Sequence, residues 1–161
     1  MRLQLADPAD HPHVGLLPFS RDLETWDLPH MREVLGLHRH VVRAVELGAD
    51  DRTAYVVKEL PDHLVLREFR LLRGLADDKL PTAEVVAAVT ERTGRRDGLL
   101  VTRHLDYSLP YRTLLGGRGL SIPYLGDRLL DALVGLLARL HLAGFFWGDC
   151  SLSNTLFRRD A

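Results

Sequence analysis

Asp149 and Asn154 stand five positions apart in a polar segment that leads into an apolar stretch at 156–157. An aspartate and an asparagine at this spacing, ahead of an apolar strand, are typical of the catalytic loop of a phosphotransferase. There the aspartate accepts the proton of the attacking hydroxyl, and the asparagine binds a magnesium ion that bridges the phosphates. The same spacing arises by chance, so the alternative is a solvated turn in which Asp149 caps Ser151 or Ser153.

Lys58 and Glu68 form a second candidate pair. Lys58 ends a β-branched stretch and shares a face with Val56, because side chains alternate across a strand. Glu68 falls on an otherwise apolar face of the next helical stretch, where a carboxylate is expected to pair with a cation. A Lys58–Glu68 ion pair would hold the lysine extended towards the α- and β-phosphates of ATP. The alternative is an exposed lysine and a glutamate that pairs with Arg67 or Arg70 on the helix surface.

The elements that must position these residues can be predicted from periodicity. Segments 40–47 and 54–60 are rich in β-branched residues and are separated by a turn sequence, which predicts a β-hairpin. A helix capped by Asp62 follows, with apolar positions every three to four residues and Gly74 as its expected C-terminal signal. Two further strands, at 85–90 and 99–105, would complete an antiparallel sheet.

The flanking segments differ in character. Leucines between 125 and 140 cover most faces of a predicted helix, which indicates packing inside a second, larger body. Residues 1–29 hold four prolines and no sustained period, which predicts an irregular arm. The expected organisation is an arm at 1–39, a small lobe at 40–106 and the start of a large lobe at 107–161.

The order of these features resembles the protein-kinase-like superfamily. From about Val41 to Phe157 the chain is similar to bacterial small-molecule and lipopolysaccharide kinases, and most of all to an uncharacterised family described as lipopolysaccharide-kinase-like. The match is carried by the run Leu140-His141…Gly144…Gly148-Asp149…Asn154. This resemblance implies an α+β fold, in which an antiparallel-sheet small lobe precedes the first helices and the catalytic loop of a large lobe.

The resemblance also implies roles for single residues. ATP and Mg²⁺ would be the cofactors, and the acceptor would be a hydroxyl of a sugar, a glycolipid or another small molecule. Asp149 would be the catalytic base and Asn154 a magnesium ligand. The nucleotide would be contacted by Lys58, which Glu68 positions, by Val56, and by Arg103 and Leu105 where the strand leads into an adenine-binding hinge.

The sequence departs from the family pattern at the phosphate-binding loop. No Gly-x-Gly-x-x-Gly segment precedes Lys58, and the candidates are 36–40 and the turn at Gly48. Trp147 stands where the family usually has a histidine that supports the catalytic loop. These departures favour an alternative function, a pseudokinase or nucleotide-binding scaffold without turnover.

A second departure concerns the end of the sequence. The chain stops at Ala161, before the strand whose aspartate holds the principal magnesium ion in the family, and Asp160 comes too soon after Asn154 to take that role. We therefore expect an N-terminal fragment of a kinase-like enzyme, inactive alone and prone to aggregate through its leucine helix.

Composition excludes several other classes. The 21 Lys and Arg residues balance 22 Asp and Glu residues, so no overall field would attract nucleic acid. The apolar stretch at 129–146 is interrupted by Asp131, Arg139 and His141, so no membrane span is expected. The single cysteine, Cys150, cannot form an internal disulfide, which favours the reducing cytoplasm.

Two other site hypotheses compete with these assignments. Cys150 and His141 would suggest a thiol nucleophile, but a lone cysteine is more often a small buried hydrophobe. No cysteine or acidic partner completes a metal site around the paired histidines, which are expected to be solvated; they stand at positions 11, 13, 38 and 40.

Overall fold

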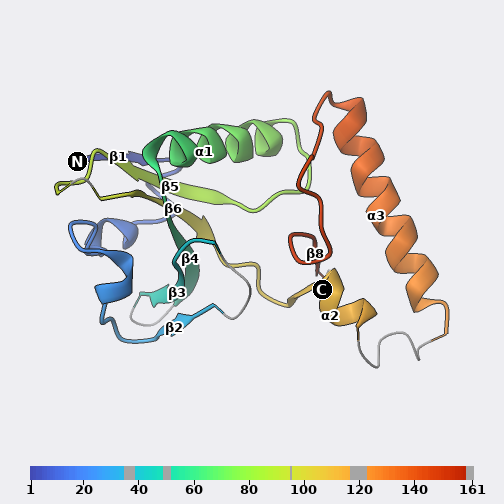
Figure 1. The fold of residues 1–161 in the computed structure, drawn as a ribbon, viewed down its shortest axis with the longest axis horizontal. Coiled ribbons are helices and arrows are strands. Elements are labelled where there is room, and N and C mark those ends of the chain that lie inside the picture. The colour runs from blue at the N-terminus through green and yellow to red at the C-terminus, as the bar shows by residue number, and fades with distance from the viewer. Residues whose placement is uncertain (35–38, 49–51, 95, 117–122, 159–161) are drawn as a thin grey trace. The chain divides into compact units, whose positions relative to one another are not determined.

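The computed structural model describes residues 1–34, 39–48, 52–94, 96–116 and 123–158. The chain forms two compact units, Met1–His104 and Leu105–Ala161. The first unit contains a six-stranded antiparallel sheet with the strand order β1-β5-β6-β4-β3-β2 (Figure 1). The second unit contains the pair β7-β8.

The predicted hairpin is present. Strand β3 (Val42–Leu47) pairs with β4 (Thr53–Leu60), and β6 (Gly98–Arg103) pairs with the other edge of β4. Strand β5 (Val85–Thr90) lies next to β6 and is buried at every position. A strand buried on both faces requires packed layers on both sides of the sheet.

Helix α1 (Asp62–Asp77) covers one of these faces. It was expected to end at Gly74, but Gly74 lies inside the helix. The helix ends because Lys79 adopts a left-handed φ of 56°, which lets the Leu80 amide bond back to the Leu75 carbonyl at 2.9 Å. A C-terminal cap needs a left-handed residue, which is most often but not always glycine.

The core consists of two layers, one on each face of the sheet. Alternation along the strands sends Leu60 and Leu100 towards α1, where they pack with Val65 and Phe69. The opposite face packs against the N-terminal segment, coloured blue in Figure 1. That second layer is built from the buried residues Val14, Leu17, Phe19, Leu23, Trp26, Val45, Tyr55, Val57, Val86, Ala87, Val89, Leu99 and Val101.

The N-terminal segment is therefore not the irregular arm that the sequence suggested. Its strands β1 (Arg2–Leu5) and β2 (Met31–Glu33) form the two edges of the sheet, paired with β5 and β3. Two single-turn 3₁₀ helices, Val14–Leu16 and Leu23–Thr25, lie between them. Strands of four and three residues are too short for an alternating pattern to be recognised in the sequence.

A buried arginine fastens this segment to the sheet. The Arg92 side chain is fully buried, and its Nε donates to the Phe19 carbonyl at 2.7 Å. Its terminal nitrogens donate to the carbonyls of Arg21 and Asp97 and to the carboxylate of Glu59. A guanidinium offers five donors, so one side chain joins the segment, β4 and the turn before β6.

The second unit begins with β7 (Ser108–Pro110) and the short helix α2 (Tyr111–Leu115). Strand β8 (Leu156–Arg158) pairs antiparallel with β7, and the rings of Tyr111 and Phe157 meet edge to face at 6.2 Å.

Helix α3 (Leu125–Leu142) carries the predicted leucines. Leu129 and Leu140 are buried, whereas Leu130 is 59% and Val134 57% exposed. Its apolar surface is therefore only partly covered. Within the described part of the chain, no helix combines the length and the hydropathy needed to cross a bilayer.

Candidate functional site

The predicted ion pair between Lys58 and Glu68 is present. The Lys58 Nζ donates to both carboxylate oxygens of Glu68, at 3.0 and 3.2 Å. About a third of each side chain is exposed, 34% for the lysine and 36% for the glutamate. Glu68 is thus held by the strand lysine rather than by Arg67 or Arg70, and the Lys58 ammonium keeps an exposed side that an anion can reach.

Local folding explains this placement. Lys58 lies on the α1 face of β4, two residues before Leu60, which is buried under the helix. Glu68 precedes Phe69, which is anchored in the same layer. Hydrophobic contacts on the C-terminal side of the lysine therefore fix the distance between strand and helix at which the ion pair forms.

Small side chains adjoin Lys58 on the same face. Val56 is half-buried and is paired in register with Ala44 on one side and Thr102 on the other. Ala44 is buried, whereas Val56 and Thr102 are half-buried. Ala44 and Thr102 were not predicted, because strand register is not visible in the sequence.

Arg103 lies on the opposite face of the sheet. It is paired in register with Tyr55, whereas Val56 and Lys58 alternate to the other side. Its guanidinium is 3.4 Å from the Glu84 carboxylate. The Arg103 side chain therefore lies on the face of the sheet opposite to that of Lys58, and its backbone amide donates to the Glu84 carbonyl at 2.9 Å. Leu105, half-buried, is the first residue of the second unit.

The structure brings Asp149 and Asn154 together. The Asn154 Nδ2 lies 3.0 Å from the Asp149 carbonyl oxygen and 3.2 Å from its Oδ2, and both residues are exposed. The backbone amides of Asn154 and Thr155 both point at the Ser151 carbonyl, at 3.1 and 3.0 Å. The turn thus holds one carboxylate and one carboxamide side by side at the surface.

The end of α3 directs the chain into this loop. Gly144 has a φ of 81°, and the Phe145 amide bonds back to the Leu140 carbonyl at 2.8 Å. Glycine tolerates this left-handed conformation, so the motif ends the helix without strain. Phe146 then stacks on His141 with ring centres 5.8 Å apart. Gly144 and His141, which belong to the sequence run that carries the family resemblance, therefore have a local structural role.

The far side of the loop is held by α2. The Tyr111 amide donates to the Thr155 carbonyl at 3.0 Å, and the Arg112 amide to the Leu152 carbonyl at 2.9 Å. The Cys150 Sγ lies 3.9 Å from the Thr155 hydroxyl, at which distance a sulfur can still hydrogen-bond. These contacts give Cys150 a place in the loop packing, and they offer no support for a thiol nucleophile.

The Asn154 side chain in the loop suits a magnesium ion. The amide oxygen of Asn154 is a hard oxygen ligand, and Mg²⁺ is usually held by one or two protein groups together with phosphate oxygens and water. No group of three His, Cys, Asp or Glu side chains arranged for a metal occurs among the residues that the structure describes. Asp160 lies outside those residues, as do 36–38 of the candidate phosphate loop.

The histidine pairs did not meet the expectation of solvated residues throughout. His11 is 3% exposed, while His13 is exposed and His40 half-buried. The fourth, His38, lies outside the described residues.

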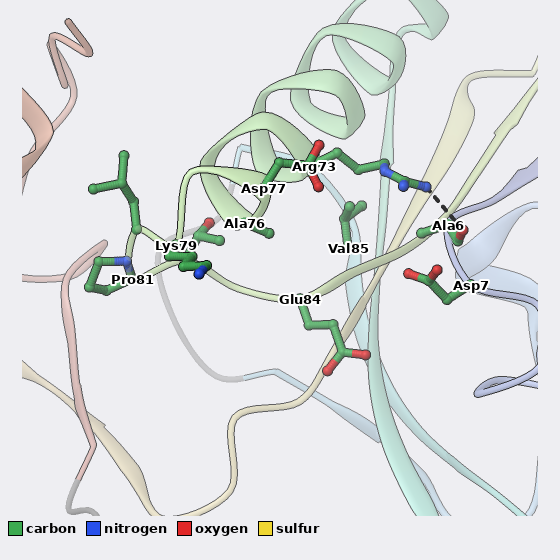
Figure 2. A pocket seen from close by; sticks show the side chains of 11 residues that line it. Ala6, Asp7, Arg73, Ala76, Asp77, Lys79, Pro81, Glu84 and Val85 are labelled. Carbon is green, nitrogen blue, oxygen red and sulfur yellow. Dashed lines mark hydrogen bonds between the residues drawn. The ribbon is translucent and has the colours of Figure 1, made fainter. Parts of the chain in front are cut away.

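A separate pocket of about 440 Å³ lies beside the C-terminal end of α1. Its charged lining residues are Asp7, Arg73, Asp77, Lys79 and Glu84 (Figure 2). Neither Lys58 nor Glu68 lines it, so this pocket is not the candidate phosphate site.

The antiparallel sheet covered by α1, followed in the chain by a second unit that contains α2 and α3, is a protein-kinase-like fold. The chain belongs to the lipopolysaccharide kinase (Kdo/WaaP) family, whose model matches residues 30–161. Among solved structures it is similar to WaaP in complex with acyl carrier protein, with a TM-score of 0.63 and 22% sequence identity. That match covers 100% of this chain, which spans 65% of the length of the WaaP chain. None of the curated proteins matches.

Proposed function

We propose that this protein binds ATP with Mg²⁺ and takes part in transferring the γ-phosphoryl group to a hydroxyl of a sugar, a glycolipid or another small molecule. The observation that carries the proposal is the Lys58–Glu68 pair, with Nζ 3.0 Å from the carboxylate, in a chain of the lipopolysaccharide kinase family. The family supports a saccharide as the acceptor. Since ATP is the donor, we propose a cytoplasmic location.

Most of the proposed nucleotide contacts come from residues of the first unit. Lys58 would contact the α- and β-phosphates, and Glu68 would keep its ammonium extended. Val56 and Thr102, half-buried on the face that carries Lys58, would pack against adenine. The backbone near Leu105 would donate and accept the hydrogen bonds of a hinge. Positioning and electrostatic stabilisation are the main contributions of a protein to phosphoryl transfer.

The residues of the loop would act on the acceptor and the metal. Asp149 would take the proton of the acceptor hydroxyl. At the same time the hydroxyl oxygen would bond to the γ-phosphorus, and the bond from that phosphorus to the ADP oxygen would break. Asn154 would ligate Mg²⁺, which neutralises charge on the phosphates when bound. The amide of Asn154 also bonds to Asp149, so the same side chain orients the base.

The proposal is tested by ATP binding to residues 1–161 and, in a protein that includes the rest of the large lobe, by ATP consumption in the presence of Mg²⁺ and a saccharide acceptor. We expect Lys58→Ala to weaken binding, and Asp149→Asn to abolish consumption while binding persists. The matched control is Asp131→Asn, which changes an exposed aspartate on α3 and should leave both unchanged. Equal activity of the Asp149 variant and the wild type would refute the assigned base.

The alternative, a pseudokinase or nucleotide-binding scaffold, is favoured by Trp147, half-buried next to the loop where the family usually has a histidine. It predicts magnesium-independent nucleotide binding with no consumption of ATP. We propose in addition that residues 1–161 alone do not turn over ATP. Magnesium-dependent turnover by this chain alone would contradict that part of the proposal.

A further inference from the structure

A buried histidine outside the candidate site joins three segments of the first unit. The His11 Nε2 is 2.9 Å from the Glu84 Oε1, and its Nδ1 is 3.1 Å from the Tyr55 hydroxyl. Its ring meets the Tyr55 ring edge to face at 5.6 Å. Because a carboxylate only accepts hydrogen bonds, Nε2 donates to Glu84.

Glu84 carries the connection onward to the end of β6. Its second oxygen is 3.4 Å from the Arg103 guanidinium, and its carbonyl accepts the Arg103 amide at 2.9 Å. Figure 2 shows the Glu84 side chain directed away from those of Arg73 and Lys79. Tyr55 faces the same residue, since it is paired with Arg103 in register. His11 thus hydrogen-bonds to both Glu84 and Tyr55, the two side chains next to Arg103.

Arg103 leads directly into the backbone near Leu105, which is proposed to contact adenine. The next amide, of His104, is fixed by the Ala54 carbonyl at 2.8 Å. Backbone donors and acceptors that recognise a base must be held in place before the base arrives, because ordering them on binding costs free energy.

We infer that His11 is a positioning residue for nucleotide binding, which acts through Glu84 on Arg103 and the segment at 104–107. The inference rests on the proposed function, because it assigns this segment to the nucleotide site. The imidazole itself is buried and need not touch the ligand. The Tyr55 hydroxyl is protonated at neutral pH even at its ordinary pKa of 10.0, and burial raises that pKa further, so the hydroxyl can donate to the His11 Nδ1.

The test compares His11→Phe with His11→Gln. Phenylalanine fills the space but makes neither hydrogen bond, whereas glutamine restores a donor to Glu84. We expect His11→Phe to weaken binding of ATP with Mg²⁺ by roughly threefold to tenfold, as suits a network that is partly exposed at Glu84 and Arg103, and His11→Gln to recover most of it. In an Arg103→Ala background the effect of His11→Phe should disappear. The exposed His13→Phe is the matched control.

Hydrogen–deuterium exchange tests the support from His11 separately from the proposed binding of ATP. Faster exchange of the amides at 104–107 in His11→Phe, with none in His13→Phe, is expected whether or not ATP binds. If the wild type binds no ATP, the proposed function fails while this readout still tests the support from His11. A lower melting temperature of His11→Phe with unchanged exchange at 104–107 and unchanged ATP affinity would reduce His11 to a core residue and overturn the inference.

Discussion

The Lys58 ammonium and the Glu68 carboxylate share two hydrogen bonds, of 3.0 and 3.2 Å, between β4 and α1. Because both side chains remain about one-third exposed, the pair contributes at most about 1 kcal/mol to the free energy of unfolding. The fold around this pair therefore does not depend on it, so loss of the pair should be seen in ligand binding.

Glu68→Gln is the first test of that statement. We expect the affinity for ATP with Mg²⁺ to fall about tenfold, because a neutral partner holds the lysine less firmly, while the free energy of unfolding changes by less than about 1 kcal/mol. Calorimetric titration and urea denaturation measure the two quantities. Arg67→Ala alters an exposed charge on the neighbouring position of α1 and serves as the control. A large loss of stability without loss of affinity would show that the pair is structural.

Asn154→Ala should raise the Mg²⁺ concentration needed for half-maximal ATP binding several-fold. The change removes an oxygen ligand and also the amide that bonds to Asp149, whereas Asn154→Asp keeps an oxygen at the same place. Magnesium titrations of the three proteins give the comparison, with the exposed Ser153→Ala as the control. An unchanged magnesium requirement in Asn154→Ala would exclude this residue as a ligand.

Gly98→Ala should destabilise the first unit by about 1–3 kcal/mol. A Cβ at this position would lie 2.7 Å from both the Val89 carbonyl oxygen and the Asp62 Oδ1, and the backbone oxygen cannot move away. Gly74→Ala is the matched opposite, because a Cβ there meets nothing within 4 Å inside α1 and should stabilise the helix by about 0.5–1 kcal/mol. Chemical denaturation of both variants measures whether Gly98→Ala lowers, and Gly74→Ala raises, the free energy of unfolding.

Stability should decrease at alkaline pH through the buried tyrosines. Burial raises the pKa of Tyr111 above its ordinary value of 10.0, so near and above pH 10 the unfolded chain loses this proton before the folded chain does. The contribution of Tyr111 is therefore fully present below that pH and is lost as the pH rises through the raised folded value. Tyr111→Phe should make the alkaline decline less steep, whereas Tyr107→Phe, at a residue 91% exposed, should not. Identical profiles for the three proteins would contradict the shift.

Much of the sheet and the helices could be predicted because their signals are local. The β-branched stretch that ends near Lys58 is followed directly by the helical apolar pattern around Glu68. The two patterns together were enough to propose the contact between Lys58 and Glu68. The end of α1 was missed because the left-handed residue is Lys79, which has no such preference of its own.

Other features depend on contacts that are distant in the sequence. The burial of His11 follows from partners at positions 55 and 84, and no local pattern around the histidine indicates them. Likewise, the neighbours of Val56 are set by register with β3 and β6, which only the folded sheet specifies.

The family match begins later in this chain than the residues that the fold needs. The family match starts at residue 30, yet the preceding 29 residues supply an edge strand and five large apolar side chains of the layer opposite α1. A shortened version starting at the family boundary would leave the buried β5 edge unpaired and its sheet face open to water. Such a protein should precipitate or bind other strands, and a failure of its ATP binding would say nothing about the catalytic residues.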